Sequence, residues 1–98
     1  MKLGGTQMKL IAINALNKHL KSFWKRPNDQ RITLLTFKKD RSLTVVGIEN
    51  TITIIETGYR HQTYSELTIA EAKHQFKHSF ATEFPRSHNV YFEQYKKN

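Results

Sequence analysis

The sequence predicts an α+β fold in which a single antiparallel sheet of three or four strands is flanked by an N-terminal and a C-terminal helix, in α-β-β-β-α order. Two patterns predict it. Residues 31–57 alternate apolar with polar side chains, which is typical of half-buried strands. Residues 8–24 and 69–84 repeat apolar side chains every three or four positions, as amphipathic helices do. The 98 residues suffice for one modest core, so we expect a single domain over residues 1–98.

The first helix is expected from Met8 to Trp24, after a flexible lead-in over residues 1–7. Thr6 is a candidate N-cap, and Pro27 ends the helix and turns the chain toward the sheet. Apolar residues form one stripe of this helix and lysines form another. Because Met-Lys-Leu occurs at both Met1 and Met8, the sequence leaves open which methionine starts translation.

Three strands are expected at Arg31–Lys39, Ser42–Ile48 and Thr51–Thr57, with two-residue turns at Asp40-Arg41 and Glu49-Asn50. Side chains alternate along a strand, so the register fixes which face meets the helices, and a slip of one residue would exchange the faces. The face toward the helices would hold Ile32, Leu34, Leu43, Val45, Ile52 and Ile54. The other face, too apolar to be left wholly in water, would hold Leu35, Phe37, Val46, Ile48 and Ile55 among Thr33, Thr44, Thr51, Thr53 and Thr57.

After the third strand, residues 58–64 either continue it past a kink at Gly58 or turn back as a short fourth strand. The sequence does not decide between the two. Tyr59, Arg60 and Tyr64 fall here, and such aromatic and cationic side chains suit contacts with bases or with a protein partner.

The second helix begins at a capping box, Thr68-Ile-Ala-Glu71, in which each of the two residues bonds the backbone amide of the other. A stripe comprising Ile69, Ala72, Phe76, Phe80 and Phe84 is expected to face the sheet, and Pro85 stops the helix. The outer side carries Lys73, His74, Lys77 and His78. His74 and His78 are one turn apart, but no His-Glu-x-x-His pattern and no cysteine accompanies them, so we predict no metal site.

The C-terminal tail, residues 86–98, is too aromatic to be only a disordered end. Its segment from Val90 to Tyr95 fits an added edge strand, a cover for the threonine-bearing face, or an arm that binds a partner.

Charge gives the main functional indication. The chain has 16 Lys and Arg against 8 Asp and Glu, a net charge of +8, which favours polyanionic partners, namely DNA or RNA or, through the first helix, the surface of an anionic membrane. We therefore expect a small basic, non-catalytic protein that binds nucleic acid as an accessory factor. The residues expected to contact phosphates are Lys18, Lys21, Lys25, Lys38, Lys39, Arg41, Arg60, Lys73 and Lys77.

The alternative is a protein-interaction module, such as an inhibitor, an adaptor or a homodimer, that uses the apolar and threonine-bearing sheet face and the tyrosine-rich tail. Its expected contact residues are Leu35, Phe37, Val46, Ile48, Tyr59 and Tyr64.

Enzymatic chemistry and membrane insertion are not indicated. The sequence has no glycine-rich phosphate loop, no Gly-x-Ser-x-Gly motif and no cysteine, so we expect no enzyme, no cofactor and a cytoplasmic location. No apolar stretch approaches the roughly 18 residues of a membrane span. The apolar run Leu10–Ile13 is too short for a secretory signal.

Overall fold

The computed structural model describes residues 8–97, which form two helices and six strands. In chain order these are β1 (Lys9–Ala12), α1 (Ile13–Lys25), β2 (Gln30–Leu35), β3 (Ser42–Ile48), β4 (Thr51–Thr57), β5 (His61–Leu67), α2 (Ile69–Glu83) and β6 (Asn89–Lys96). The α+β class is confirmed. The predicted three or four strands and the α-β-β-β-α order are wrong. The predicted lead-in and Thr6 lie outside the described residues.

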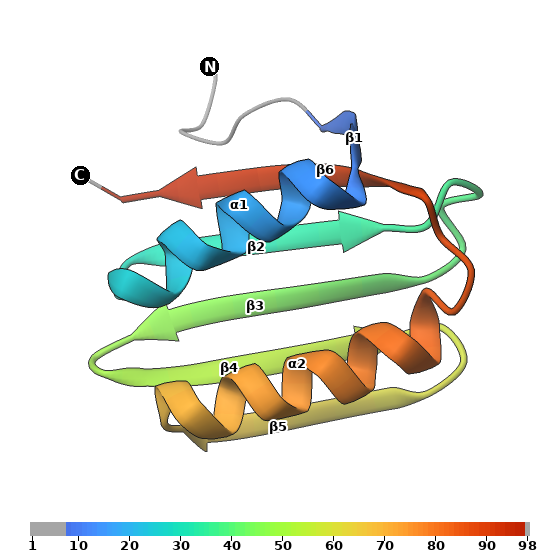
Figure 1. The fold of residues 1–98 in the computed structure, drawn as a ribbon. Coiled ribbons are helices and arrows are strands. Elements are labelled where there is room, and N and C mark those ends of the chain that lie inside the picture. Colours follow the sequence, from blue (N-terminus) through green and yellow to red (C-terminus); the bar gives the residue numbers. More distant parts are fainter. Residues whose placement is uncertain (1–7, 98) are drawn as a thin grey trace, which may run out of the picture.

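The six strands form one antiparallel sheet in the order β1-β6-β2-β3-β4-β5, and both helices lie on the same face of it (Figure 1). Helix α1 contacts β1 and β6, whereas α2 contacts β3, β4 and β5. The described part of the chain is thus two layers thick, and none of its elements covers the opposite face of the sheet.

The core lies between these layers and confirms the predicted faces of the strands. The predicted pairing of the first two strands of the block is wrong, because Leu35 rather than Lys39 lies opposite Ser42, but this shift of four residues is even and leaves the faces unchanged. The six apolar residues predicted to face the helices are each 1% exposed or less. Leu16, Leu20 and Phe23 of α1 pack on them, as do Ala72 and Phe76 of α2. Ile69, predicted in the same stripe of α2, is instead 40% exposed at the first turn of the helix.

The N-terminal segment departs from prediction because Lys9–Ala12 is a strand and helix α1 begins only at Ile13. Ala12 is the N-cap, with an extended backbone and no side-chain capping bond, while the Ile13 amide donates to the His88 carbonyl at 3.1 Å. The strand β1 pairs with β6, which places Ile11 opposite the buried Val90.

The tail forms β6, which lies between β1 and β2 in the sheet and so matches none of the three alternatives that the sequence left open. Alternation along β6 buries Val90 and Phe92, which are 0% and 3% exposed. The strand β1 pairs with Asn89 to Phe92, and β2 pairs with Tyr91 to Lys96, so the apolar tail completes the sheet and does not cover its threonine-bearing face.

One predicted turn is confirmed and the other is wrong. Glu49 and Asn50 both have positive φ angles, 51° and 68°, as a type I′ two-residue hairpin requires. The strand β2 ends at Leu35, and the next six residues form a loop before β3. Thr36 closes this loop: its amide donates to the Arg41 carbonyl at 3.0 Å and its hydroxyl donates to Asp40 at 2.8 Å.

Past Gly58 the chain turns back and forms β5, so residues after Gly58 form a new strand and do not continue β4. The turn is anchored by the buried carboxylate of Glu83 at the end of α2. Its two oxygens accept from the amides of Tyr59 and Arg60 at 2.8 and 2.9 Å. At the other end of α2 the capping box between Thr68 and Glu71 is confirmed, with hydrogen bonds of 2.9 and 3.1 Å.

Candidate nucleic-acid interface

The helix layer is strongly basic. Its exposed surface carries Lys18, Lys21 and Lys25 on α1 and Lys73 and Lys77 on α2. Helix α1 contains no acidic residue. Five of the nine cations predicted to contact phosphates therefore belong to one layer of the fold.

The two acidic residues of α2 do not offset this charge. The Glu71 carboxylate is used in the capping box, and Glu83 is buried against the backbone of the β4–β5 turn. Within residues 8–97 the structure has one ion pair, between Arg60 Nε and Glu56 Oε1 at 3.5 Å. None of the five helix lysines in this part of the chain therefore has a carboxylate partner. They remain available to an external anion.

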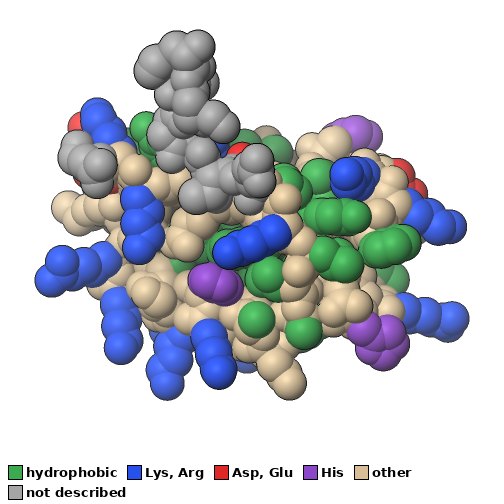
Figure 2. All heavy atoms as spheres, turned by 90° about the horizontal axis from the view of Figure 1, so that it is seen from above, with side chains coloured by type: hydrophobic (Ala, Val, Ile, Leu, Met, Phe, Trp, Pro, Cys, Tyr) green, Lys and Arg blue, Asp and Glu red, His purple; other side chains and the backbone are tan. Residues whose placement is uncertain are grey.

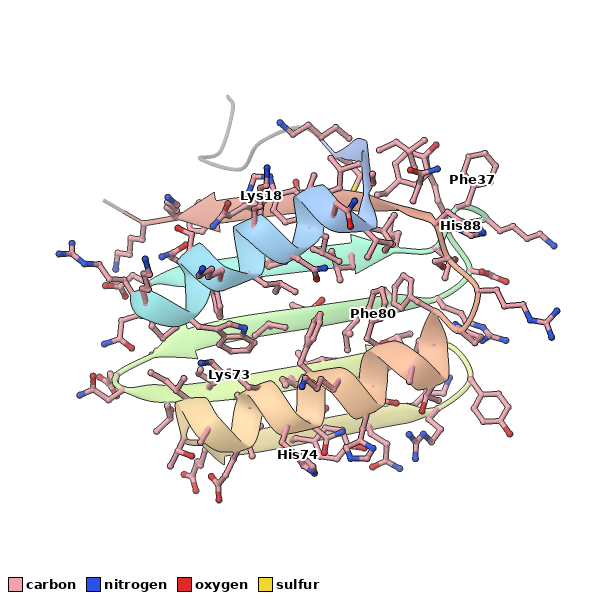
Figure 3. All side chains as sticks on the ribbon, in the orientation of Figure 1. Lys18, Phe37, Lys73, His74, Phe80 and His88 are labelled. Carbon is pink, nitrogen blue, oxygen red and sulfur yellow. The ribbon has the colours of Figure 1, made fainter. Side chains whose placement is uncertain are left out.

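A groove runs between the two helices, and we call it the lysine-rimmed groove. Its volume is about 410 Å³, and it is lined by Asn17, Leu20, Lys21, Trp24, Lys73, Phe76, Lys77, Phe80 and Ala81. None of these nine residues is acidic. Figure 3 shows Lys73 and Phe80 on the side of α2 that faces α1, with His74 on the other side. The floor is apolar and both rims carry ammonium groups.

A second hollow extends this surface toward the C-terminal end of α1. It has a volume of about 490 Å³ and is lined by Lys25, Arg26, Pro27, Asn28, Asn50, Ile52 and Ile69. The linings of the two hollows are adjacent along both helices: Trp24 and Lys25 are consecutive in α1, and Ile69 and Lys73 are about one helical turn apart in α2. Neither lining contains a carboxylate.

The charge distribution is visible on the surface. Figure 2 views the molecule from the edge formed by β1 and β6, with the helices toward the bottom of the picture. Lys and Arg side chains project along the lower left, over α1, while acidic side chains show only in the upper part of the view. Basic side chains also project in the upper part and at the right of this view, so the helix side differs from the rest of this face chiefly in showing no acidic side chain.

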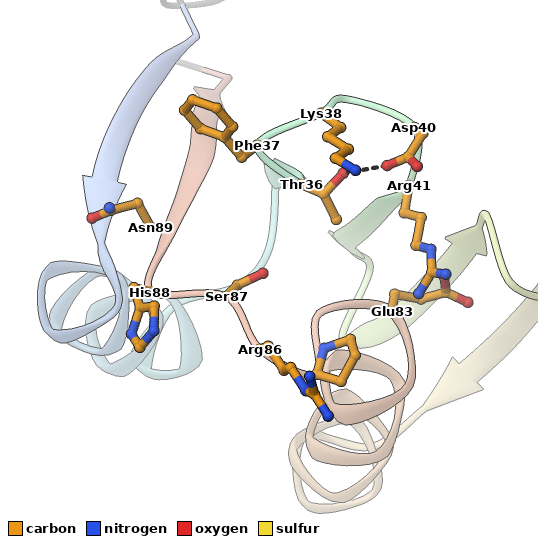
Figure 4. Close-up of a pocket in the computed structure, with 11 residues that line it drawn as sticks. Thr36, Phe37, Lys38, Asp40, Arg41, Glu83, Arg86, Ser87, His88 and Asn89 are labelled. Atoms are coloured by element: carbon orange, nitrogen blue, oxygen red, sulfur yellow. Dashed lines mark hydrogen bonds between the residues drawn. The ribbon is translucent and has the colours of Figure 1, made fainter.

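The other predicted cations lie at the β2–β3 loop and the β4–β5 turn. Lys38 and Arg41 line a hollow of about 530 Å³ together with Arg86, between the β2–β3 loop and the α2–β6 connection (Figure 4). Asp40 and Glu83 share that lining, so its charges are mixed. Lys39 lies 4.5 Å from the ring centroid of Tyr91.

Asp40 in this hollow is fixed by its loop. The Thr36 hydroxyl, donating to Oδ1 at 2.8 Å, is the largest influence that lowers the pKa of the Asp40 carboxyl, and nearby Arg41 and Lys38 lower it further. Asp40 is therefore a persistent negative charge among these cations, which makes this hollow a poorer anion site than the lysine-rimmed groove.

Arg60 is engaged within the protein. Besides its ion pair with the buried Glu56, its guanidinium donates to the Thr82 hydroxyl at 2.9 Å. This side chain ties the β4–β5 turn to α2 and does not lie in the lysine-rimmed groove.

The predicted partner-binding residues are divided among four places. Leu35, Val46 and Ile48 lie on the sheet face away from the helices, as the register requires. Phe37 projects from the β2–β3 loop, 66% exposed, and stacks on Tyr91 at 6.2 Å. Tyr59 is 71% exposed at the β4–β5 turn. Tyr64 lies opposite Ile54 and packs against the core on the helix side.

The two histidines of α2 face each other, with Nε2 atoms 3.2 Å apart and ring centroids 4.6 Å apart. Among residues 8–97 no group of three or more metal-ligating side chains forms. Glu71 is used in the capping box and His88 lines the hollow at the β2–β3 loop, so neither supplies a third ligand.

No family model, curated protein or solved structure matches this chain. Between residues 8 and 97 neither helix has the length and apolar character needed to cross a lipid bilayer.

Proposed function

We propose that this is a small, non-catalytic protein that binds nucleic acid through the lysines of its helix layer. One observation carries the proposal: Lys21 of α1 and Lys73 and Lys77 of α2 converge on one groove whose lining has no acidic residue. Lys18 and Lys25 extend the same surface along α1. A cytoplasmic location belongs to the proposal, in keeping with the absence of cysteine.

Physical chemistry favours a polyanion over a single small anion. Five exposed ammonium groups spread over two helices match a row of phosphates, and each phosphate contact releases condensed counterions from the nucleic acid. Lysine suits this task because its charge makes no demand for a fixed bidentate geometry. Binding of this kind is strong at low salt and carries little sequence information.

Titration of labelled DNA and RNA across a salt series tests the proposal. If all five lysines contact phosphates of a single strand, log K falls with log salt with a slope of about −3.5, which is roughly a 100-fold loss between about 50 and 200 mM salt. The triple variant Lys21→Gln/Lys73→Gln/Lys77→Gln should reduce the slope to about −1.4, or roughly a 7-fold loss over the same range.

The matched control is Lys38→Gln/Lys39→Gln/Arg41→Gln, which removes the same three charges from the β2–β3 loop. The proposal expects this variant to keep a slope within about one unit of the wild type. Equal losses in both variants would mean that net charge alone drives binding, and no binding by the wild type at low salt would overturn the proposal.

A second candidate function is self-association through the open sheet face. The supporting observation is that the tail is a strand of the sheet, so no described element covers Leu35, Val46 and Ile55 on that face. Sedimentation of the wild type and of Val46→Glu, whose added charges would repel across a dimer interface, tests it. A monomer at high protein concentration would exclude this candidate.

A further inference from the structure

The floor of the lysine-rimmed groove is aromatic. Trp24, Phe76 and Phe80 line it together with Leu20. Phe80 already stacks nearly parallel on Phe84, at 4.9 Å and 5°, and on Phe76, at 5.8 Å and 21°. These phenylalanines form a continuous stack along α2.

Trp24 is arranged differently. It meets Phe23 and Phe76 at 5.2 and 6.3 Å with interplanar angles of 75° and 78°, so neither ring lies parallel to the indole. The side chain is partly exposed, and it lines the groove directly beside Lys21. A planar group that stacked on the indole would therefore replace no existing parallel ring contact of Trp24.

We infer that the groove accepts unpaired bases, so that the ligand is a single-stranded nucleic acid with its bases turned toward Trp24 and its phosphates along the lysine rims. This inference rests on the proposed function and narrows it. In a duplex the bases are paired and stacked inside, so a duplex would reach the lysines but not the floor. A strand with free bases uses both parts of the groove.

The lining also predicts low sequence preference. Apart from the three ammonium groups, the side chains of the groove offer only the amide of Asn17 and the indole N–H of Trp24 for hydrogen bonding. Reading a base requires several hydrogen-bonding groups placed against its edge, whereas stacking uses the π-face that all bases share. We therefore expect pyrimidine and purine strands to bind with similar affinity.

An acidic amphipathic peptide is the competing occupant, because it would also match an apolar floor between basic rims. The fluorescence of Trp24 distinguishes a bound nucleic acid from a bound peptide, because this residue is the single tryptophan of the chain and lies in the groove. A base stacked on the indole quenches its emission, whereas an apolar peptide shifts the emission to the blue without stacking.

The experiment compares oligothymidylate with an abasic strand of equal length, which has the same phosphates and no bases. The expected result is that oligothymidylate quenches Trp24 and binds more tightly than the abasic strand, by roughly 5- to 150-fold for one stacked base. Equal affinity and no quenching would overturn the inference while leaving phosphate binding intact. If neither strand binds at low salt, the proposed function itself fails.

Two variants test whether the difference in affinity between oligothymidylate and the abasic strand comes from stacking on the Trp24 indole. Trp24→Leu keeps an apolar side chain and should bring oligothymidylate down to the affinity of the abasic strand, whereas Trp24→Phe should restore part of the difference. Affinity for the abasic strand, measured by anisotropy, reports whether each variant is folded with its lysines in place. If Trp24→Leu still bound oligothymidylate more tightly than the abasic strand by the wild-type factor, stacking on Trp24 would be refuted. The inference would also be overturned if an acidic peptide bound the wild type and shifted its emission to the blue while oligothymidylate did not bind.

Discussion

Replacing Glu83 by glutamine should destabilise the fold more than any exposed carboxylate substitution. The carboxylate is 1% exposed, and its two oxygens accept from the Tyr59 and Arg60 amides. Glutamine is nearly the same shape but offers one oxygen and one NH₂ group, so one of the two backbone amides would face a donor instead of an acceptor.

The cost follows from these two hydrogen bonds. Leaving one backbone amide without an acceptor lowers the free energy of unfolding by about 1–3 kcal/mol. The other amide keeps its hydrogen bond, but to a neutral oxygen in place of a charged one, which costs about 1 kcal/mol more. Because the turn is only partly buried, water satisfies some of the lost bonding, and we expect about 2 kcal/mol in total. In a domain of this size that corresponds to a fall in Tm of roughly 8–16 °C.

Thermal unfolding followed by far-ultraviolet circular dichroism at neutral pH measures this loss. Glu49→Gln, at the exposed β3–β4 turn, is the matched control because it removes the same charge from a solvated position, and its Tm should stay within about 3 °C of the wild type. A Glu83→Gln variant that melted as close to the wild type as this control would refute the account of Glu83 as the anchor of the β4–β5 turn.

Two further predictions concern Gly47 in β3 and Thr36 in the β2–β3 loop. A Cβ at Gly47 would lie 2.1 Å from the Pro27 carbonyl oxygen, which belongs to the backbone and cannot rotate away. Gly47→Ala should therefore lower the free energy of unfolding, measured in urea, by about 3 kcal/mol. An unchanged urea midpoint would contradict this. Thr36→Val should raise the pKa of Asp40 toward its ordinary 3.8, as followed by NMR titration of the carboxyl carbon, and an unaltered titration would refute the role of the hydroxyl. Since the folded pKa is the lower one, ionised Asp40 stabilises the wild type above pH 3.8, and this contribution is lost as the pH falls through the folded pKa.

The parts of the fold that depend on local pattern were predictable. Alternation assigned Ile32 and Val45 to the buried face, and the capping box located the start of α2. The segment Lys9–Ala12 was misread because Ile11 fits a helical stripe and an alternating strand equally well. Pairing with Val90 decides in favour of the strand, and that contact joins opposite ends of the chain.

The candidate site was predictable in composition but not in geometry. Charge and spacing identified lysines on the outer sides of both helices, including Lys21, Lys73 and Lys77. That these three border one groove depends on how α1 and α2 sit side by side on the sheet, which neither helix encodes alone. Trp24 enters the sequence analysis only as the last residue of the predicted first helix, because its place in the groove appears only when α2 is packed next to α1.

The interior position of β6 has a consequence for synthesis. During translation β1, α1 and the strands β2 to β5 leave the ribosome before β6, yet β1 joins the sheet only through β6. Until β6 emerges, the edge of β2 is unpaired and the apolar side chains of α1 lack Val90 and Phe92 as packing partners. The nascent chain therefore exposes an aggregation-prone strand edge until β6 is made, and the basic helix layer is assembled only after β6 is inserted.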